Sequence, residues 1–160
     1  MILDEVPVRS RLDVFIPGLP RPQGSLKIIT SRSIGRAFAK NSDTTIQHRN
    51  HVAFHLAESW GFEEPALPGP VRLDAEFWFP RPKSHYGTGK NADKLKASAP
   101  TLHTGRVDLD KLVRLLGDAL TIAGVINDDC LIFFAVAGKQ WVTTSTDRVG
   151  TQVTVSEAVT

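Results

Sequence analysis

The chain has 160 residues, 41% of them hydrophobic and 22% charged, with a formal net charge of +2 and one cysteine. This length and apolar fraction predict a single globular domain, residues 1–160, with its own core. No apolar run is long enough to cross a membrane, and the first residues lack the basic and apolar regions of a secretory signal. The single Cys130 excludes an internal disulfide. These features together predict a cytoplasmic protein with no membrane partner.

The basic residues are unevenly distributed, because 16 of the 19 Lys and Arg residues fall in two segments. Eight lie between Arg9 and His51 beside two acidic residues, and eight lie between Arg81 and Arg114 beside three. A solvated surface is the ordinary explanation of charge, but two clusters of one sign are typical of contact with DNA or RNA. The candidate DNA-binding residues are Arg21, Lys27, Arg32, Arg36, Lys40, Lys83, Lys90, Lys94, Lys96, Arg106 and Lys111.

The N-terminal part of the chain predicts a strand, a hairpin and a helix. Residues 1–10 read as a loose arm, and the alternation of residues 12–16 predicts a strand that Pro17-Gly18 ends. Residues 27–30 and 36–39 predict a hairpin around a turn that contains Gly35. A helix capped by Thr44 or Thr45 is expected to run to Trp60, with Gly61 ending it.

The clearest strand is residues 71–79, in which apolar and polar side chains alternate until Pro80. Residues 81–106 then show no apolar period and carry glycines and several lysines. A connection of this length inside a small domain is usually functional or mobile. We therefore expect a basic loop that moves in the free protein and becomes ordered on DNA.

The C-terminal part predicts a second helix and further strands. Residues 108–123 carry a buried stripe at helical spacing, with Gly124 placed to follow the helix end. An apolar strand is expected over 130–137, with Cys130 buried in it and Gly138 breaking it. Residues 141–144 and 150–155 suggest a final edge strand or pair. The predicted fold class is α+β, a mixed sheet with two main helices packed on it.

Two acidic clusters lie at the ends of the second helix, with Asp108 and Asp110 at its start and in its first turn and Asp128 and Asp129 after it. Carboxylates gathered without cationic partners repel one another, and a divalent cation relieves that repulsion. Mg²⁺ prefers carboxylate oxygen and leaves water positions open for a substrate phosphate. The simpler explanations are helix capping for Asp108 and a turn for the Asp128 pair, but neither accounts for the whole set.

The order of these motifs resembles that of RusA-type Holliday-junction resolvases over most of residues 12–155. The similar segments are Ile16-Pro17-Gly18-Leu19-Pro20, Phe77-Trp78-Phe79-Pro80-Arg81-Pro82-Lys83, Val107-Asp108-Leu109-Asp110-Lys111-Leu112-Val113-Arg114, Gly117-Asp118-Ala119-Leu120 and Asn127-Asp128-Asp129. A lone DxD motif is weak. A DxD motif followed by a basic residue four positions on, then DAL and then DD, is specific.

The resemblance implies a homodimeric, Mg²⁺-dependent endonuclease, with Mn²⁺ able to substitute, that nicks four-way DNA junctions symmetrically and leaves 5′-phosphate and 3′-hydroxyl ends. It implies that Asp108, Asp110 and Asp129 bind the metal, that Asp128 contributes, and that Arg114 is the catalytic basic residue. Many members have lysine where this chain has Arg114. Because arginine stays protonated near neutral pH, Arg114 can stabilise charge but cannot donate a proton.

Other functions remain as alternatives. A non-catalytic protein that binds branched DNA would show the same basic segments, and a sugar-nucleotide transferase also uses a DxD motif with a divalent cation. A P-loop and an EF-hand do not match the sequence. His48, His51 and His55 have helical spacing that suits a zinc site, but a fourth ligand is missing nearby. The apolar residues 130–137, or an edge of their sheet, are the candidate dimer contact.

Overall fold

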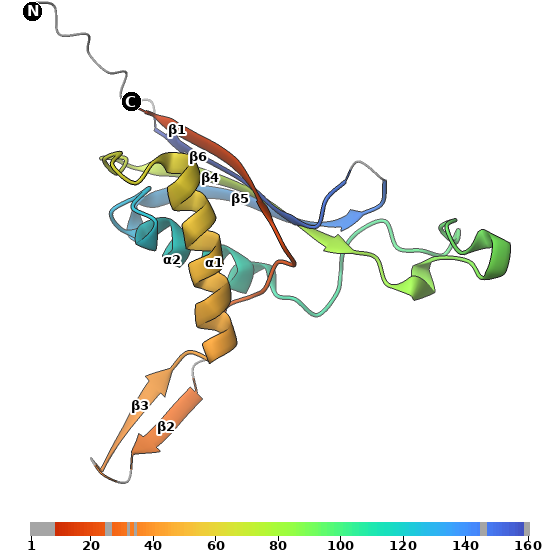
Figure 1. The fold of residues 1–160 in the computed structure, drawn as a ribbon, viewed down its shortest axis with the longest axis horizontal. Coiled ribbons are helices and arrows are strands. Elements are labelled where there is room, and N and C mark those ends of the chain that lie inside the picture. Colours follow the sequence, from red (N-terminus) through yellow and green to blue (C-terminus); the bar gives the residue numbers. More distant parts are fainter. Residues whose placement is uncertain (1–8, 25–26, 32, 34, 145–146, 159–160) are drawn as a thin grey trace, which may run out of the picture.

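The computed structural model describes residues 9–158 apart from 25–26, 32, 34 and 145–146. A four-stranded sheet in the order β1-β6-β4-β5 forms one layer, and the helices α1 and α2 pack on it (Figure 1). A separate two-stranded hairpin, β2–β3, projects from the body. The predicted α+β class, a mixed sheet with two main helices, is confirmed. Most of the predicted N-terminal arm lies outside the described residues.

The N-terminal elements occur where the sequence predicts them. They are β1 (Arg11–Pro17), β2 (Lys27–Ser31), β3 (Arg36–Lys40) and α1 (Asp43–Trp60), with Gly61 at the end of α1.

The predicted cap of α1 is wrong. Ser42 caps the helix, and its side chain accepts a hydrogen bond of 3.3 Å from the backbone N–H of Thr45. The Thr45 side chain instead accepts a hydrogen bond from the backbone N–H of Gly24, so it holds the preceding loop rather than the helix end.

The strand β4 (Val71–Pro80) is central and alternates as predicted, with every odd-numbered residue from Val71 to Phe79 buried. Its neighbour β6 (Gly150–Glu157) pairs antiparallel with both β4 and β1. The prediction of a C-terminal edge strand is therefore wrong, because β6 lies inside the sheet. The alternation of Thr and Val in β6 fits a strand with one buried face in either position, so it does not reveal the neighbours.

The strand β5 (Ile132–Val142) lies at the sheet edge and runs parallel to β4. The helix α2 (Leu109–Ile122) makes the crossover between these two strands, as parallel neighbours require. The predicted boundaries 130–137 are wrong. Cys130 lies in a short 3₁₀ turn, η3 (Asp129–Leu131), and is exposed, while the strand passes through Gly138. An edge strand needs only one set of ladder bonds, so a glycine within it is tolerated.

The core lies between the helices and one face of the sheet. Fully buried side chains include Leu56 and Trp60 of α1, Leu116 and Leu120 of α2, and Leu73 of β4. The opposite face of the sheet is not covered by either helix. No helix in the described part of the chain is both long and apolar enough to span a membrane.

Candidate active site

Asp108 stands at the N-cap position of α2, but its side chain makes no capping hydrogen bond. Its carboxylate instead lies 3.0 Å from the ammonium group of Lys111, one turn along the helix. The expectation that Asp108 has no local cationic partner is therefore wrong. Both side chains are substantially exposed, and exposed ion pairs contribute little free energy, so this pairing leaves the carboxylate available for another cation.

Asp110 and Arg114 follow on the exposed surface of α2, one helical turn apart. An aspartate in the first turn also interacts favourably with the helix dipole. Gly117 continues this face of the helix, because positions four and seven residues further on lie over one another. The predicted succession of Asp110, Arg114 and Asp118 along one polar face is borne out by exposed or half-buried side chains at all three positions.

Asp129 lies against α2 at Gly117. A Cβ atom at Gly117 would be 3.5 Å from the Cβ of Asp129 and 4.0 Å from its Oδ2. A larger side chain at position 117 would therefore occupy the space of the Asp129 carboxylate. Asp129 thus shares one face of α2 with Asp110 and Arg114, although 19 residues separate the two aspartates in the sequence. The helix rise puts Gly117 about 10 Å beyond Asp110 along the axis.

Asp128 has a different environment. Its carboxylate accepts a hydrogen bond of 2.8 Å from the backbone N–H of Cys130 and so caps the η3 turn. This backbone hydrogen bond, together with the contact to the Cys130 side chain, lowers the pKa of Asp128 below its ordinary value. The turn explanation considered for this pair is therefore correct for Asp128, although both carboxylates are exposed.

A pocket of about 310 Å³ opens beside Asp129. It is lined by Arg49, Asp118, Thr121, Ile122, Asp128 and Asp129. Arg49 comes from α1, and its Nε atom is buried without a hydrogen-bond partner within the described residues. Sequence reasoning missed Arg49, because nothing in the pattern of α1 shows that this residue faces the end of α2.

The described residues contain no group of three His, Cys, Asp or Glu side chains placed to hold a metal ion. Asp108, Asp110 and Asp129 thus do not form such a group, and neither do the three histidines of α1. All three aspartates are exposed. Their oxygen donors suit a hard divalent cation, which also takes water and phosphate oxygen as ligands.

The loop between β1 and β2 brings basic charge to the N-terminal end of α2. The backbone N–H of Gln23 donates to the carbonyl oxygen of Lys111 at 3.1 Å, so the loop touches the first turn of the helix. The exposed Arg21 is held by a bond from its backbone N–H to Nε2 of His48. The strands β2 and β3 carry Lys27, Arg36 and Lys40, and Arg32 lies outside the described residues.

The second basic segment forms an arm, residues 81–106, that extends away from the sheet (Figure 1). It contains two short 3₁₀ turns, η1 (Lys83–His85) and η2 (Gly89–Asn91). Its predicted DNA-binding residues are all exposed, namely Lys83, Lys90, Lys94, Lys96 and Arg106. Its mobility in the free protein stays a prediction.

Trp141, near the end of β5, contacts residues at both ends of the arm. Trp141 donates from its indole nitrogen to the carbonyl oxygen of Leu102 at 3.2 Å, and its ring stacks on His103 at 4.0 Å. Burial in this contact lowers the pKa of His103. Arg81 lies over the other side of the same cluster, 5.5 Å from the Trp141 ring centre.

Lys139 fixes the residues that lead into α2. Its ammonium group donates to the carbonyl oxygens of Val107 at 2.7 Å and Gly105 at 3.1 Å. Sequence reasoning missed Lys139 and Trp141, because a contact between a strand and a distant loop leaves no local pattern.

The fold and this site define a nucleic-acid hydrolase, since exposed carboxylates on one helix lie beside basic segments that project from the body. A family model described as Endodeoxyribonuclease RusA matches residues 17–156, nearly the whole chain, and the chain belongs to this family. The family comprises endodeoxyribonucleases that resolve Holliday junctions and depend on a divalent metal ion. The protein is therefore a hydrolase that acts on DNA. No curated protein matches the sequence significantly.

Proposed function

We propose that this protein resolves four-way DNA junctions in the cytoplasm by nicking two opposing strands symmetrically, with Mg²⁺ as the natural cofactor and Mn²⁺ as a substitute. The products are a 5′-phosphate and a 3′-hydroxyl. The observation that carries the proposal is the position of Asp129 against Gly117, on the face of α2 that also presents Asp110 and Arg114. The family assignment favours this function over a sugar-nucleotide transferase.

The three exposed aspartates would hold the cation. A divalent ion bound there supplies positive charge to the scissile phosphate and lowers the pKa of a water molecule. Asp108 and Asp110 would hold the ion from the start of α2, and Asp129 would hold it from η3.

Arg114 lies between Asp110 and Gly117 along α2 and is exposed. Its guanidinium supplies a permanent positive charge where negative charge develops on the phosphate. It acts by electrostatic stabilisation, because it does not release a proton at neutral pH. Lys111, now paired with Asp108, would be free to contact DNA phosphate if Asp108 held a cation instead.

Paired cuts require two equivalent sites, and a homodimer supplies them. The edge strand β5 is the proposed contact. Its backbone is paired on one side only, and its exposed side chains include Phe133 at 61%, Phe134 at 48% and Val136 at 47% of their full surface. Elsewhere the uncovered face of the sheet is polar, with the pairs Arg11–Asp13 and Arg72–Asp74 along it. An unpaired apolar edge is a site of association.

The proposal is tested by the three variants Asp108→Asn, Asp110→Asn and Asp129→Asn. Each lowers Mg²⁺-dependent nicking of a synthetic four-way junction by about a hundredfold or more, because a charged ligand is lost. Binding of the junction in the presence of a chelator stays the same or becomes tighter, since negative charge near phosphate is removed.

Asp13→Asn, on the far face of the sheet, is the charge-matched control and keeps full activity. Wild-type nicking by any one of the three variants removes that residue from the site. Tight junction binding by the wild-type protein without any metal-dependent nicking would instead support the non-catalytic alternative.

A further inference from the structure

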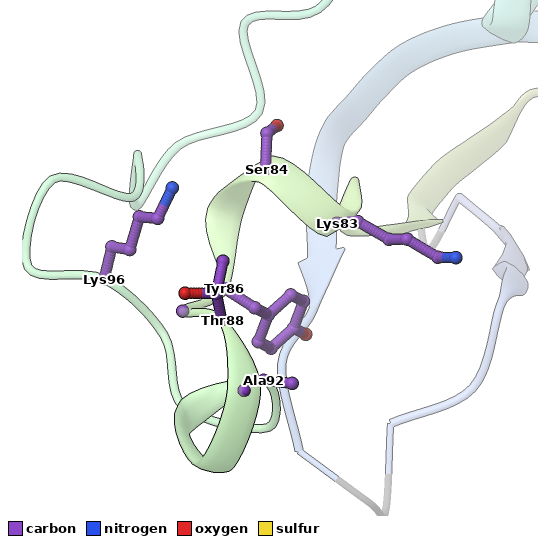
Figure 2. Close-up of a pocket in the computed structure, with 8 residues that line it drawn as sticks. Lys83, Ser84, Tyr86, Thr88, Ala92 and Lys96 are labelled. Carbon is purple, nitrogen blue, oxygen red and sulfur yellow. The ribbon is translucent and has the colours of Figure 1, made fainter.

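A pocket on the arm has no role in the proposed cleavage. It encloses about 600 Å³, which is within the range of small-molecule sites. Its walls are Lys83, Ser84, Tyr86, Gly87, Thr88, Gly89, Ala92 and Lys96 (Figure 2). All of these residues come from one short stretch of the arm, so the pocket belongs to the arm alone.

Backbone hydrogen bonds hold the pocket walls in place without a hydrophobic core. The N–H of Gly87 donates to the carbonyl oxygen of Lys94, and the N–H of Lys96 donates to that of His85, each at 2.9 Å. Tyr86 and Leu95 form an antiparallel bridge between the outgoing and returning chain. The arm is thus a hairpin whose two sides present Tyr86 and Lys96.

Two glycines permit this shape. A Cβ atom at Gly87 would lie 2.7 Å from the backbone oxygen of Asn91, which is too close for any other residue. Gly89 has a φ of +57°, a conformation that side chains rarely adopt. The sequence thus specifies a tight turn below the pocket, although no buried apolar contact requires it.

The chemistry of the walls suits a nucleotide. Two lysines and three hydroxyl-bearing side chains line the pocket, and no carboxylate does. In Figure 2 the Tyr86 ring and Lys96 belong to the two sides of the hairpin, and the Lys83 side chain extends away from Lys96. A half-exposed aromatic ring offers a stacking surface for a base, and lysine ammonium groups bind phosphate.

We propose that this pocket takes up one unpaired nucleotide from the branch point of the DNA. Its base stacks on the ring of Tyr86, and the ammonium group of Lys96 binds its phosphate. The inference rests on the proposed function for its substrate, branched DNA. It adds a recognition step: the arm distinguishes an exposed base at a branch from a continuous duplex. Because every base has a stacking face, the pocket selects structure and not sequence.

The test combines removal of the ring with removal of the base. Binding is measured in the presence of a chelator, so that cleavage is not needed. The probes are a four-way junction with one unpaired thymidine at its branch point and the same junction with an abasic site there. The wild-type protein binds the abasic junction about tenfold more weakly, the size expected for one lost stacking contact. Tyr86→Ala weakens binding of the thymidine junction by the same factor and does not distinguish the two probes.

The arm provides matched control variants. Lys96→Ala, in the pocket, reduces the preference for the junction over a linear duplex. Lys90→Ala and Lys94→Ala, on the same arm but outside the lining, weaken both DNAs alike. Tyr86→Phe keeps the ring and retains the preference for the thymidine junction.

A direct readout is available because Tyr86 is the only tyrosine of the chain. Protein with isotope-labelled tyrosine gives one set of ring signals by NMR, which shift on adding the thymidine junction and not the abasic one. The proposal is overturned if Tyr86→Ala lowers the affinity for both junctions equally. It is also overturned if the Tyr86 ring signals shift by the same amount with the thymidine and the abasic junction. A protein that binds as described but fails to nick with Mg²⁺ would overturn the proposed function and leave this pocket standing.

Discussion

Asp128 and Asp129 are neighbours in the chain, but their carboxylates have different contacts. The Asp128 carboxylate is occupied by the backbone N–H of Cys130, and that hydrogen bond explains its lowered pKa. The Asp129 carboxylate lies over Gly117 beside the exposed surface of α2. Asp128 therefore shapes the turn that positions Asp129, and both side chains line the pocket at the end of α2; a contribution of Asp128 to catalysis stays a prediction.

His48 provides a prediction about pH. Burial, and then the nearby charges of His51 and Arg21, lower its pKa from 6.5 to about 4. The unfolded chain therefore binds a proton at His48 more tightly than the folded one, so stability is full above about pH 6.5 and falls as pH drops toward about 4. His48→Gln removes the titrating imidazole but keeps a side-chain acceptor for the backbone N–H of Arg21. We expect its melting temperature to fall less between pH 7 and pH 4 than that of the wild type.

Thermal unfolding followed by circular dichroism at several pH values checks this difference. His55→Gln, another histidine of α1, is the control and keeps the wild-type slope. Parallel curves for His48→Gln and the wild type would show that His48 is equally easy to protonate in both states.

Sequence reasoning at this scale found the residues that repeat in a motif and missed those that meet through space. The spacing of Asp110, Arg114 and Asp118 on a helix follows from chain geometry alone, and the structure agrees. The ion pair of Asp108 with Lys111 is also local, and a check of positions three residues apart could have found it. Arg49 reaches the pocket at Asp129 from another helix, and no local rule connects them.

Among the elements, β5 links the arm to the start of α2. Lys139 on this strand holds the carbonyl oxygens of Gly105 and Val107, immediately before Asp108. Lys139→Met keeps the length of the side chain and removes both bonds. We expect nicking to fall by about tenfold, because a small displacement of a reacting group is costly, while junction binding stays close to the wild type.

Single-turnover nicking rates and equilibrium binding, measured separately, check this prediction. Gln140→Met, at the next position of β5, is the control and leaves both quantities unchanged. A loss of affinity equal to the loss of rate would mean that Lys139 contacts DNA and does not position Asp108.

The elements were predictable where one side faces the core and the other faces water. The alternation of β4 and the stripe of α2 show their buried faces directly, so both were predicted within one or two residues. The strand β5 was harder, because its apolar residues are exposed at an edge and do not mark a buried face. The place of β6 between β1 and β4 depends on pairing with distant strands, which its own residues do not encode.

The whole molecule is predicted to be a two-fold dimer through β5. Phe134→Asp or Val136→Asp places charge on the exposed apolar part of this strand. Each substitution is expected to shift the mass in light scattering from two chains to one chain of 17.5 kDa. Phe62→Asp, at a phenylalanine that is 70% exposed outside the sheet, is the control and keeps the dimer. A wild-type monomer at micromolar concentration with junction DNA present would contradict the prediction.

The salt dependence of junction affinity tests whether the arm contacts the DNA backbone. The arm places Lys83, Lys90, Lys94 and Lys96 in solvent, away from the sheet (Figure 1). Contacts to phosphate carry no base information, and each one releases counterions, so each lost contact flattens the plot of log affinity against log salt by roughly one unit. Replacing all four lysines with alanine is therefore expected to weaken junction binding at physiological salt and to reduce the slope by about three units or more.

Isothermal calorimetry with Mn²⁺ serves as the control, because the aspartates of α2 and η3 are untouched and metal binding should persist. An unchanged slope in the quadruple variant would show that the arm does not follow the DNA backbone. The phosphate contacts would then lie on the other basic segment, where Arg21 sits beside the first turn of α2 and the hairpin carries Lys27, Arg36 and Lys40.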